Sequence, residues 1–280
     1  MRIAVTGANG YLGSGVVNQL IAEGHTVIAV SRHTQNINKQ AEIIASDIFD
    51  MSDPYIEMGE PDVLLHAAWQ NGFIHNSESH INNLSKHVAF IEKMMKSDVR
   101  MISVLGTVHE VGFFEGSVND STPTNPTTYY GIAKNSLRQV TEMLAKMNNK
   151  QFQWLRAFYI VGDKKSVHSD QSVFGKIVRA DLEKTPTFPF VQGKNQFDFM
   201  DYSDFVENVA LAITQFNVDG IINIASGMPE QLIARMTKFI TDNNLSIKLD
   251  IGKYPDRPYD SKAIWGDNTK LKAIATHHLK

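Results

Sequence analysis

The stretch Thr6-Gly7-Ala8-Asn9-Gly10-Tyr11-Leu12-Gly13 lies near the N-terminus and decides the fold class. It places a glycine at every third position, after a short β-branched segment and before an amphipathic helical pattern. Glycines at this spacing let a pyrophosphate approach the backbone, and the amides that open the following helix stabilise its charge. The alternative is a turn with a purely structural role. We therefore expect a dinucleotide to be bound by Gly7, Asn9, Gly10, Tyr11, Leu12 and Gly13.

Short β-branched segments alternate with helical patterns through the first two-thirds of the chain. The predicted strands cover residues 3–5, 26–30, 42–45, 63–66, 101–104 and 152–157. Between them, apolar residues recur at helical spacing over 12–21 and over 81–95. This alternation predicts an α/β, Rossmann-like, doubly wound parallel sheet with helices on both faces.

The composition shifts after about residue 160 towards glycine, proline and aromatic residues, interrupted by helical patterns near 174–182 and 205–213. We expect a cofactor-binding domain over residues 1–160, with about 200–227 returning to it. Residues 161–280 would then mainly form a smaller C-terminal substrate-binding lobe.

Bulk properties exclude several functional classes. The net charge of -3, without long basic runs, argues against a nucleic-acid partner. The lack of cysteine excludes disulfides, thiolate metal sites and thiol catalysis, and we expect no metal site. Because the chain starts directly with a predicted strand and has no apolar run long enough for a membrane span, we expect a cytoplasmic protein without a membrane partner.

The end of the second predicted strand indicates which cofactor is preferred. A NAD-binding protein usually carries an acidic residue there, which binds the adenosine ribose. Here Ser31 holds that position and Arg32 follows it, and a guanidinium can pair with a 2′-phosphate. This favours NADP (NADPH) over NAD, the alternative being a solvated surface arginine. At the ends of the next two strands, further cofactor contacts are expected from Asp47, Ile48, His66, Ala67 and Ala68.

Tyr130-Gly131-Ile132-Ala133-Lys134 places a phenol and an ammonium group one helical turn apart on one face of a helix. A free phenol titrates near pH 10, and a fixed positive charge nearby favours its ionised form. We expect Tyr130 to act as an acid or base. Lys134 is expected to lower the pKa of the phenol and to hold the nicotinamide ribose, so both residues also belong to the cofactor site.

With these motifs the chain resembles the extended short-chain dehydrogenase/reductase family, in its NAD(P)-dependent epimerase/dehydratase branch. Later landmarks also match, among them Leu155-Arg156-Ala157-Phe158, Asn223-Ile224-Ala225-Ser226-Gly227 and Arg257-Pro258. The resemblance implies that Arg257 binds the diphosphate of a nucleoside-diphosphate sugar, with a structural salt bridge as the alternative. It also implies a catalytic Thr107, because a glycine, Gly112, follows it after four residues. Tyr159 stands where many relatives have asparagine.

The surroundings of Thr107 bear on the reaction. Dehydratases of this family need a pair of carboxylates directly after the threonine, where this chain has Val108 and His109. His109 is expected to contact the substrate instead, although an isolated loop histidine can also be incidental. Elimination of water is therefore not expected.

The resemblance extends to nucleotide-sugar 4-ketoreductases such as the dTDP-4-dehydro-6-deoxyglucose reductases. It implies NADPH-dependent reduction of the 4-keto group of a nucleoside-diphosphate, typically dTDP, 4-keto-6-deoxyhexose. A NAD-dependent nucleotide-sugar 4-epimerase and a non-catalytic NADP-binding regulatory module are the alternatives. Relatives commonly dimerise, so a homodimer is expected, and the apolar stripe Val88, Ile91 and Met95 would lie either at that interface or in the core.

Overall fold

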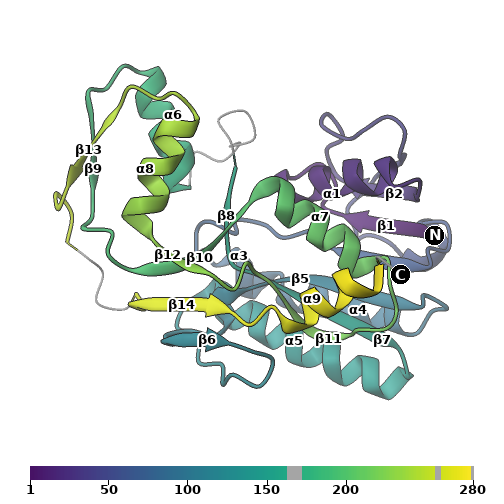
Figure 1. Ribbon diagram of the computed structural model, residues 1–280. Helices are drawn as coiled ribbons and strands as arrows, with labels where there is room; N and C mark the ends of the chain where they lie inside the picture. The colour runs from purple at the N-terminus through teal and green to yellow at the C-terminus, as the bar shows by residue number, and fades with distance from the viewer. Residues whose placement is uncertain (163–171, 256–259, 279–280) are drawn as a thin grey trace.

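A central sheet of seven parallel strands organises the molecule, in the order β11-β7-β5-β4-β1-β2-β3 (Figure 1). The computed structural model describes residues 1–162, 172–255 and 260–278. The strands are β1 (Arg2–Thr6), β2 (Thr26–Ser31), β3 (Glu42–Ala45), β4 (Val63–His66), β5 (Met101–Thr107), β7 (Gln151–Ala157) and β11 (Gly220–Ile224). Every strand predicted from the sequence is present, and the Rossmann-like fold class is confirmed. The chain places β2 and β3 on one side of β1 and then returns to place β4 on the other side. Ligands of such sheets bind outside the carboxyl ends of the strands where the order reverses, here between β1 and β4.

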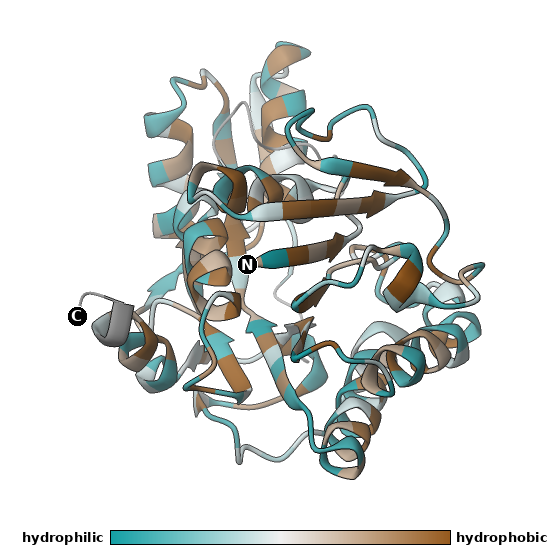
Figure 2. Cartoon of the chain, turned by 90° about the vertical axis from the view of Figure 1, so that its right-hand side faces the viewer, coloured by the Kyte–Doolittle hydropathy of each residue, from teal (hydrophilic) through white to brown (hydrophobic). Residues whose placement is uncertain are grey.

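Helices cover both faces of this sheet. Apolar side chains of α1 (Tyr11–Ala22) and α7 (Tyr202–Ile213) pack on one face, together with α9 (Thr269–His278). The opposite face is covered by α2 (Pro54–Glu57), α4 (Leu84–Met95) and α5 (Tyr129–Asn148). Figure 2 shows largely brown, hydrophobic colouring along the sheet strands and teal on the outer helix surfaces, as expected for strands buried on both sides.

The helix expected over 81–95 is interrupted at Asn83. It divides into α3 (Ser79–Asn82) and α4, and the Asn83 side chain donates a hydrogen bond to Gln70 Oε1 at 3.2 Å. Asparagine disfavours helix interiors because its amide competes for such local hydrogen bonds. Ile91 and Met95 are fully buried in the core and Val88 packs against it, so the core explanation holds for that apolar stripe.

A second sheet lies beside the carboxyl ends of the central strands. It has the order β12-β10-β14-β6, and β8 also pairs with β10. Its strands are β6 (Gly116–Val118), β8 (Tyr159–Val161), β10 (Gln196–Asp201), β12 (Pro229–Gln231) and β14 (Ala263–Gly266). A separate apolar cluster joins this sheet to α6 (Val173–Leu182), α8 (Leu232–Asp242) and the parallel pair β9 (Thr187–Phe190) and β13 (Lys248–Ile251).

The chain crosses between the two sheets more than once. The segments α7, β11 and α9 pack with the central sheet. Conversely β6, from the first half of the chain, pairs with β14. The division at residue 160 stays a prediction. Among the helices of the described residues, none combines the length and the apolar character needed to cross a membrane.

Candidate active site

A cleft of about 600 Å³ opens at the carboxyl ends of β1, β4, β5 and β7, facing the second sheet. The sequence-predicted residues that line it are Gly7, Gly10, Tyr11, Leu12, Gly13, Ala67, Thr107, His109, Tyr130 and Lys134. Tyr159, which departs from the family pattern, also lines it. The structure thus brings the glycine loop and the predicted catalytic residues to one cavity.

The glycine loop is shaped by close backbone approaches. Gly7 has a φ of +70°, and a Cβ placed there would lie 2.8 Å from the Cα of Ala68. A Cβ on Gly13 would lie 2.3 Å from the carbonyl oxygen of Gly7. Gly10 directly precedes α1, and no side chain caps the first amides of this helix. Gly10 and the first residues of α1 line the cleft. This cradle fits the pyrophosphate of a dinucleotide.

Tyr202, the first residue of α7, fastens this loop and was not found from the sequence. Its hydroxyl donates to the carbonyl of Tyr11 at 2.6 Å, and the two rings stack with centroids 4.3 Å apart. A Cβ on Gly15 would lie 2.2 Å from the same hydroxyl oxygen. The contact spans 191 positions of the chain, so no local pattern could have indicated it.

The residues expected at the adenosine end do not line the cleft. Arg32 is 60% exposed and its Nη1 lies 3.7 Å from Oδ2 of Asp47, while Ser31 ends β2 beside it. Asn9 Oδ1 accepts a hydrogen bond from the Asn36 amide at 2.8 Å. The Ile48 side chain is buried in the core. Their predicted cofactor contacts stay predictions.

The His66 side chain lies in the core, away from the cleft. Its Nδ1 is 2.9 Å from Thr6 Oγ1, and its Nε2 is 2.9 Å from Nδ1 of His87. Burial lowers the pKa of His66 well below its usual value and that of His87 to about 3, so both rings are neutral at pH 7. His66 is buried and does not line the cleft, and its predicted cofactor contact stays a prediction. The Ala68 amide is also engaged, donating to Thr6 Oγ1 at 3.3 Å.

Tyr130 and Thr107 meet at the floor of the cleft. Thr128 caps α5 by accepting a hydrogen bond from the Gly131 amide at 3.1 Å, which starts the helix just before Tyr130. Thr107, the last residue of β5, lies close enough to the phenol to favour its ionised form, and its Oγ1 accepts a hydrogen bond from the His109 amide at 3.3 Å. Burial raises the pKa of Tyr130 to about 12, so the phenol carries its proton at neutral pH.

Lys134 is held one turn further along α5. Its Nζ donates to the carbonyl of Leu105 at 2.7 Å and lies 3.9 Å from the ring centroid of Trp69. Burial lowers the pKa of Lys134 to about 7. The expected lowering of the Tyr130 pKa by this lysine is not what the structure shows, because burial is the dominant influence and moves the phenol in the opposite direction.

Two further cleft residues escaped the sequence reasoning. Trp69 lines the cleft, and its place directly after the predicted strand end at Ala67-Ala68 could have indicated it. Its Nε1 donates a hydrogen bond to His80 Nδ1 at 3.0 Å. His75 lies with its ring centroid 4.3 Å from that of His109 and 5.5 Å from that of Tyr130. It sits in a loop with no periodic pattern, so nothing local indicated it.

The sequence also predicted a diphosphate-binding Arg257 and no metal site. Arg257 lies outside the described residues, and its diphosphate role stays a prediction. Within the ranges that the structure describes, there is no group of three or more histidine, cysteine, aspartate or glutamate residues that could hold a metal ion.

Comparison with known proteins places this site in a family. Residues 3–225 match the model of the NAD dependent epimerase/dehydratase family. The dTDP-6-deoxy-L-talose 4-dehydrogenase (NAD(+)) of Aggregatibacter actinomycetemcomitans is 39% identical over 272 residues, covering 95% of this chain and 99% of that protein. A putative UDP-glucose 4-epimerase of Methanocaldococcus jannaschii is 26% identical over 238 residues, covering 80% and 77%.

Solved structures agree with the fold. The UDP-glucose 4-epimerase of Thermotoga maritima, solved with UDP-glucose, has a TM-score of 0.83 at 22% identity and covers 98% of this chain and 93% of its own. Because the family model spans most of the chain and the A. actinomycetemcomitans relative matches it almost end to end, the chain belongs to the NAD-dependent epimerase/dehydratase family.

Proposed function

We propose that the protein reduces the 4-keto group of a nucleoside-diphosphate 4-keto-6-deoxyhexose, preferably dTDP-linked, with NADPH. The observation that carries this proposal is the meeting of Thr107, Tyr130 and Lys134 in one cleft with the glycine loop. The name of the A. actinomycetemcomitans relative supports the sugar class and the position, because a 4-dehydrogenase acting in reverse is a 4-ketoreductase.

The side chains divide the work as follows. A bound NADPH would lie along the glycine loop and supply hydride to the C4 carbon. The protonated phenol of Tyr130 donates its proton to the oxygen at C4, and the Thr107 hydroxyl holds that oxygen by a hydrogen bond. A phenol with a pKa near 12 is a suitable donor to an alkoxide, which is a stronger base. Lys134 would bind the nicotinamide ribose from the floor of the cleft.

The preference for NADPH rests on Ser31 and Arg32. Arg32 directly follows β2, its side chain is 60% exposed, and its Nη1 lies 3.7 Å from Asp47 Oδ2, so the guanidinium is open to a 2′-phosphate. The relative is named for NAD(+), so the two cofactors must be compared directly. We expect Arg32→Ala to raise the KM for NADPH about tenfold, by losing one charge-assisted pair, and to leave the KM for NADH nearly unchanged.

A 4-epimerase is the second candidate, and the M. jannaschii relative favours it. An epimerase returns the hydride to the other face of the same sugar and keeps its cofactor, whereas a reductase releases oxidised cofactor in each turnover. The two are separated by incubating the enzyme with unmodified nucleotide hexoses and no added cofactor, and looking for interconversion by NMR.

The primary test follows NADPH oxidation at 340 nm with a panel of freshly prepared nucleoside-diphosphate 4-keto-6-deoxyhexoses, with NADH in parallel. The proposal expects sugar-dependent oxidation and a product reduced at C4. Interconversion of nucleotide hexoses without net oxidation would assign the epimerase instead. Binding of NADPH without turnover on either class would assign the regulatory module.

We also propose a cytoplasmic homodimer. Exposed apolar side chains recur along one face of α5, at Tyr129, Ile132, Met143 and Met147. The resemblance to the family implies dimer contacts through the helices after the fourth and fifth strands, and α5 follows the fifth. We assign to its stripe the role first considered for Val88, Ile91 and Met95.

A further inference from the structure

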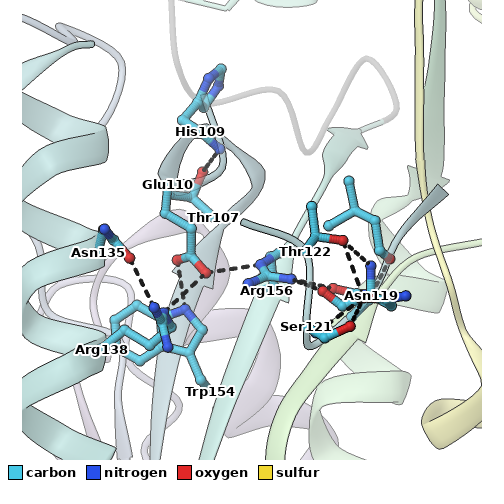
Figure 3. A network of polar contacts seen from close by, with 12 residues as sticks. Thr107, His109, Glu110, Asn119, Ser121, Thr122, Asn135, Arg138, Trp154 and Arg156 are labelled. Atoms are coloured by element: carbon cyan, nitrogen blue, oxygen red, sulfur yellow. Dashed lines mark hydrogen bonds and ion pairs between the residues drawn. The ribbon is translucent and has the colours of Figure 1, made fainter. Parts of the chain in front are cut away.

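The buried carboxylate of Glu110 lies beneath the cleft and has no role in the mechanism above. Glu110 ends η1 (Val108–Glu110), the short 3₁₀ turn that follows Thr107. Its side chain is 0% exposed; Oε1 accepts a hydrogen bond from Arg156 Nε at 2.8 Å and Oε2 accepts one from Trp154 Nε1 at 2.6 Å. Nε of Arg138 lies 3.9 Å from Oε1 (Figure 3). A buried carboxylate with such partners is costly to disturb.

These contacts join three elements of the fold. Glu110 belongs to the turn after β5, Trp154 and Arg156 to β7, and Arg138 to α5. Arg156 is fixed in turn, because its Nη1 donates to the carbonyl of Asn119 at 3.0 Å (Figure 3). The turn that starts at Thr107 is therefore anchored from below by charge-assisted hydrogen bonds.

The same carboxylate acts on the charge of Lys134. Lys134 is buried on α5, and Arg138, which lies beside the Glu110 carboxylate, is one helical turn further along the same helix. Glu110 favours the ammonium form of Lys134, against the effect of burial. The titratable or charged groups around Lys134 are Glu110 of η1, Tyr130 and Arg138 of α5, His66 of β4, His80 of α3 and His87 of α4.

The three histidines contribute no positive charge at pH 7. Burial is the main cause that lowers the pKa of each of them, and Lys134 lowers each of the three further. The pKa of Lys134 is therefore set by two opposing influences: burial lowers it and Glu110 raises it.

We propose that Glu110 is a positioning residue: its carboxylate, bonded to Trp154 and Arg156, fixes the turn that carries Thr107 and favours the ammonium form of Lys134. The proposal deepens the proposed function and rests on it for its catalytic meaning. Burial already holds the pKa of Lys134 near 7, so removal of the negative charge leaves the amine largely neutral at pH 7. A neutral amine binds a ribose hydroxyl more weakly and no longer offsets negative charge developing in the cleft.

The direct test titrates Lys134 itself. Protein labelled with ¹³C at the lysine ε carbon is titrated by NMR between about pH 5 and pH 10, which spans the lowered pKa of Lys134 and approaches the ordinary lysine pKa. The variant Lys134→Met assigns the resonance. Glu110→Gln keeps the shape and an acceptor oxygen but removes the charge, and we expect it to lower the titration midpoint by about one pH unit. Glu142→Gln is the matched control, because Glu142 pairs with the same Arg138 from the partly exposed side of α5. Its midpoint should equal that of the wild type.

Kinetics supply the second readout. With a midpoint about one unit lower, the loss of kcat in Glu110→Gln should grow from about twofold at pH 6 to about fivefold at pH 7, on top of a pH-independent loss from the loosened turn. Lowering the pH should thus rescue part of the activity.

An unchanged Lys134 midpoint in folded Glu110→Gln would overturn the proposal, whether or not the enzyme turns over any sugar. If this variant does not fold, Arg138→Gln tests the same carboxylate in the opposite direction. It removes the cation 3.9 Å from Glu110 Oε1, so the negative charge of Glu110 acts on Lys134 less opposed and the midpoint should rise; an unchanged value would count against the proposal. Failure of the 340 nm assay alone would refute the proposed reaction and leave the electrostatic result standing.

Discussion

At the scale of single residues, the phenol of Tyr130 makes the sharpest prediction. Tyr130→Phe removes the proton donor and keeps the ring that packs near His75. We expect kcat to fall by about 10³-fold or more, since general acid catalysis contributes about 10²–10⁴. The Kd for NADPH, measured by calorimetry, should change little. Retained turnover would remove Tyr130 from the mechanism.

The buried histidine pair predicts a loss of stability in acid. The folded-state pKa of His87 is about 3, below the unfolded value of about 6.5. The unfolded chain therefore binds a proton that the native state does not, and stability falls as the pH drops from about 6.5 towards 3, by about 1.4 kcal/mol per pH unit for each such group.

Replacing the titrating ring should flatten this dependence. His87→Asn can still hydrogen-bond His66 but does not titrate, so its deficit in unfolding free energy should shrink as the pH falls from about 6.5 to 4. Urea denaturation at several pH values measures this, with the exposed His33→Asn as control. A deficit that stays constant with pH would show that His87 is protonated in the native state.

Site residues could be predicted from the sequence where they lie close together within one helix or loop. The glycine loop and the Tyr130–Lys134 pair are readable because their spacing within one element dictates their geometry. Trp69 stood next to a predicted strand end and could have been found. Tyr202 and Glu110 act through partners distant in sequence, on α1 and β7, and no local pattern reports such packing.

At the scale of elements, the packing of β5 against β7 decides how the catalytic turn is held. A Cβ on Gly106 would lie 2.1 Å from Nε1 of Trp154, the atom that donates to Glu110. Glycine at this position lets the two strands bring the indole under the turn. Strand existence was predictable from β-branched runs, whereas the break at Asn83 depended on its contact with Gln70.

Gly106→Ala should therefore destabilise the fold. Overpacking of a buried site costs about 1–3 kcal/mol, and the displaced indole would also weaken its bond to Glu110. Thermal unfolding should show a drop of several degrees in Tm relative to Gly72→Ala, whose added Cβ meets no atom of the described residues within 4 Å. Equal Tm values for the two variants would contradict this account of the β5–β7 contact.

At the scale of the whole molecule, the cleft is lined both by the carboxyl ends of central strands and by Tyr159 and Ile160 of β8, which pairs with the second sheet. The Rossmann half followed from the sequence alone. The pairing of β6 with β14 did not, because strands of three and four residues from distant parts of the chain leave little pattern.

The proposed dimer is a prediction at the same scale. Met143→Glu and Met147→Glu together place two charges on the exposed stripe of α5, and desolvating them at an interface would be unfavourable. Light scattering should report a dimer for the wild type and a monomer for the double variant, with unchanged circular dichroism. A monomeric wild type would remove this interface.

The central claim is net hydride transfer to C4 with release of the cofactor. It is tested most directly with NADPH carrying deuterium at the nicotinamide C4, on the transferred face, and a nucleoside-diphosphate 4-keto-6-deoxyhexose. We predict one deuterium at C4 of the sugar product, seen by NMR as loss of the H4 signal and collapse of its couplings, with one NADP formed per product. A product that keeps hydrogen at C4, formed without consumption of NADPH, would contradict the reductase and indicate an enzyme that returns the sugar's own hydride.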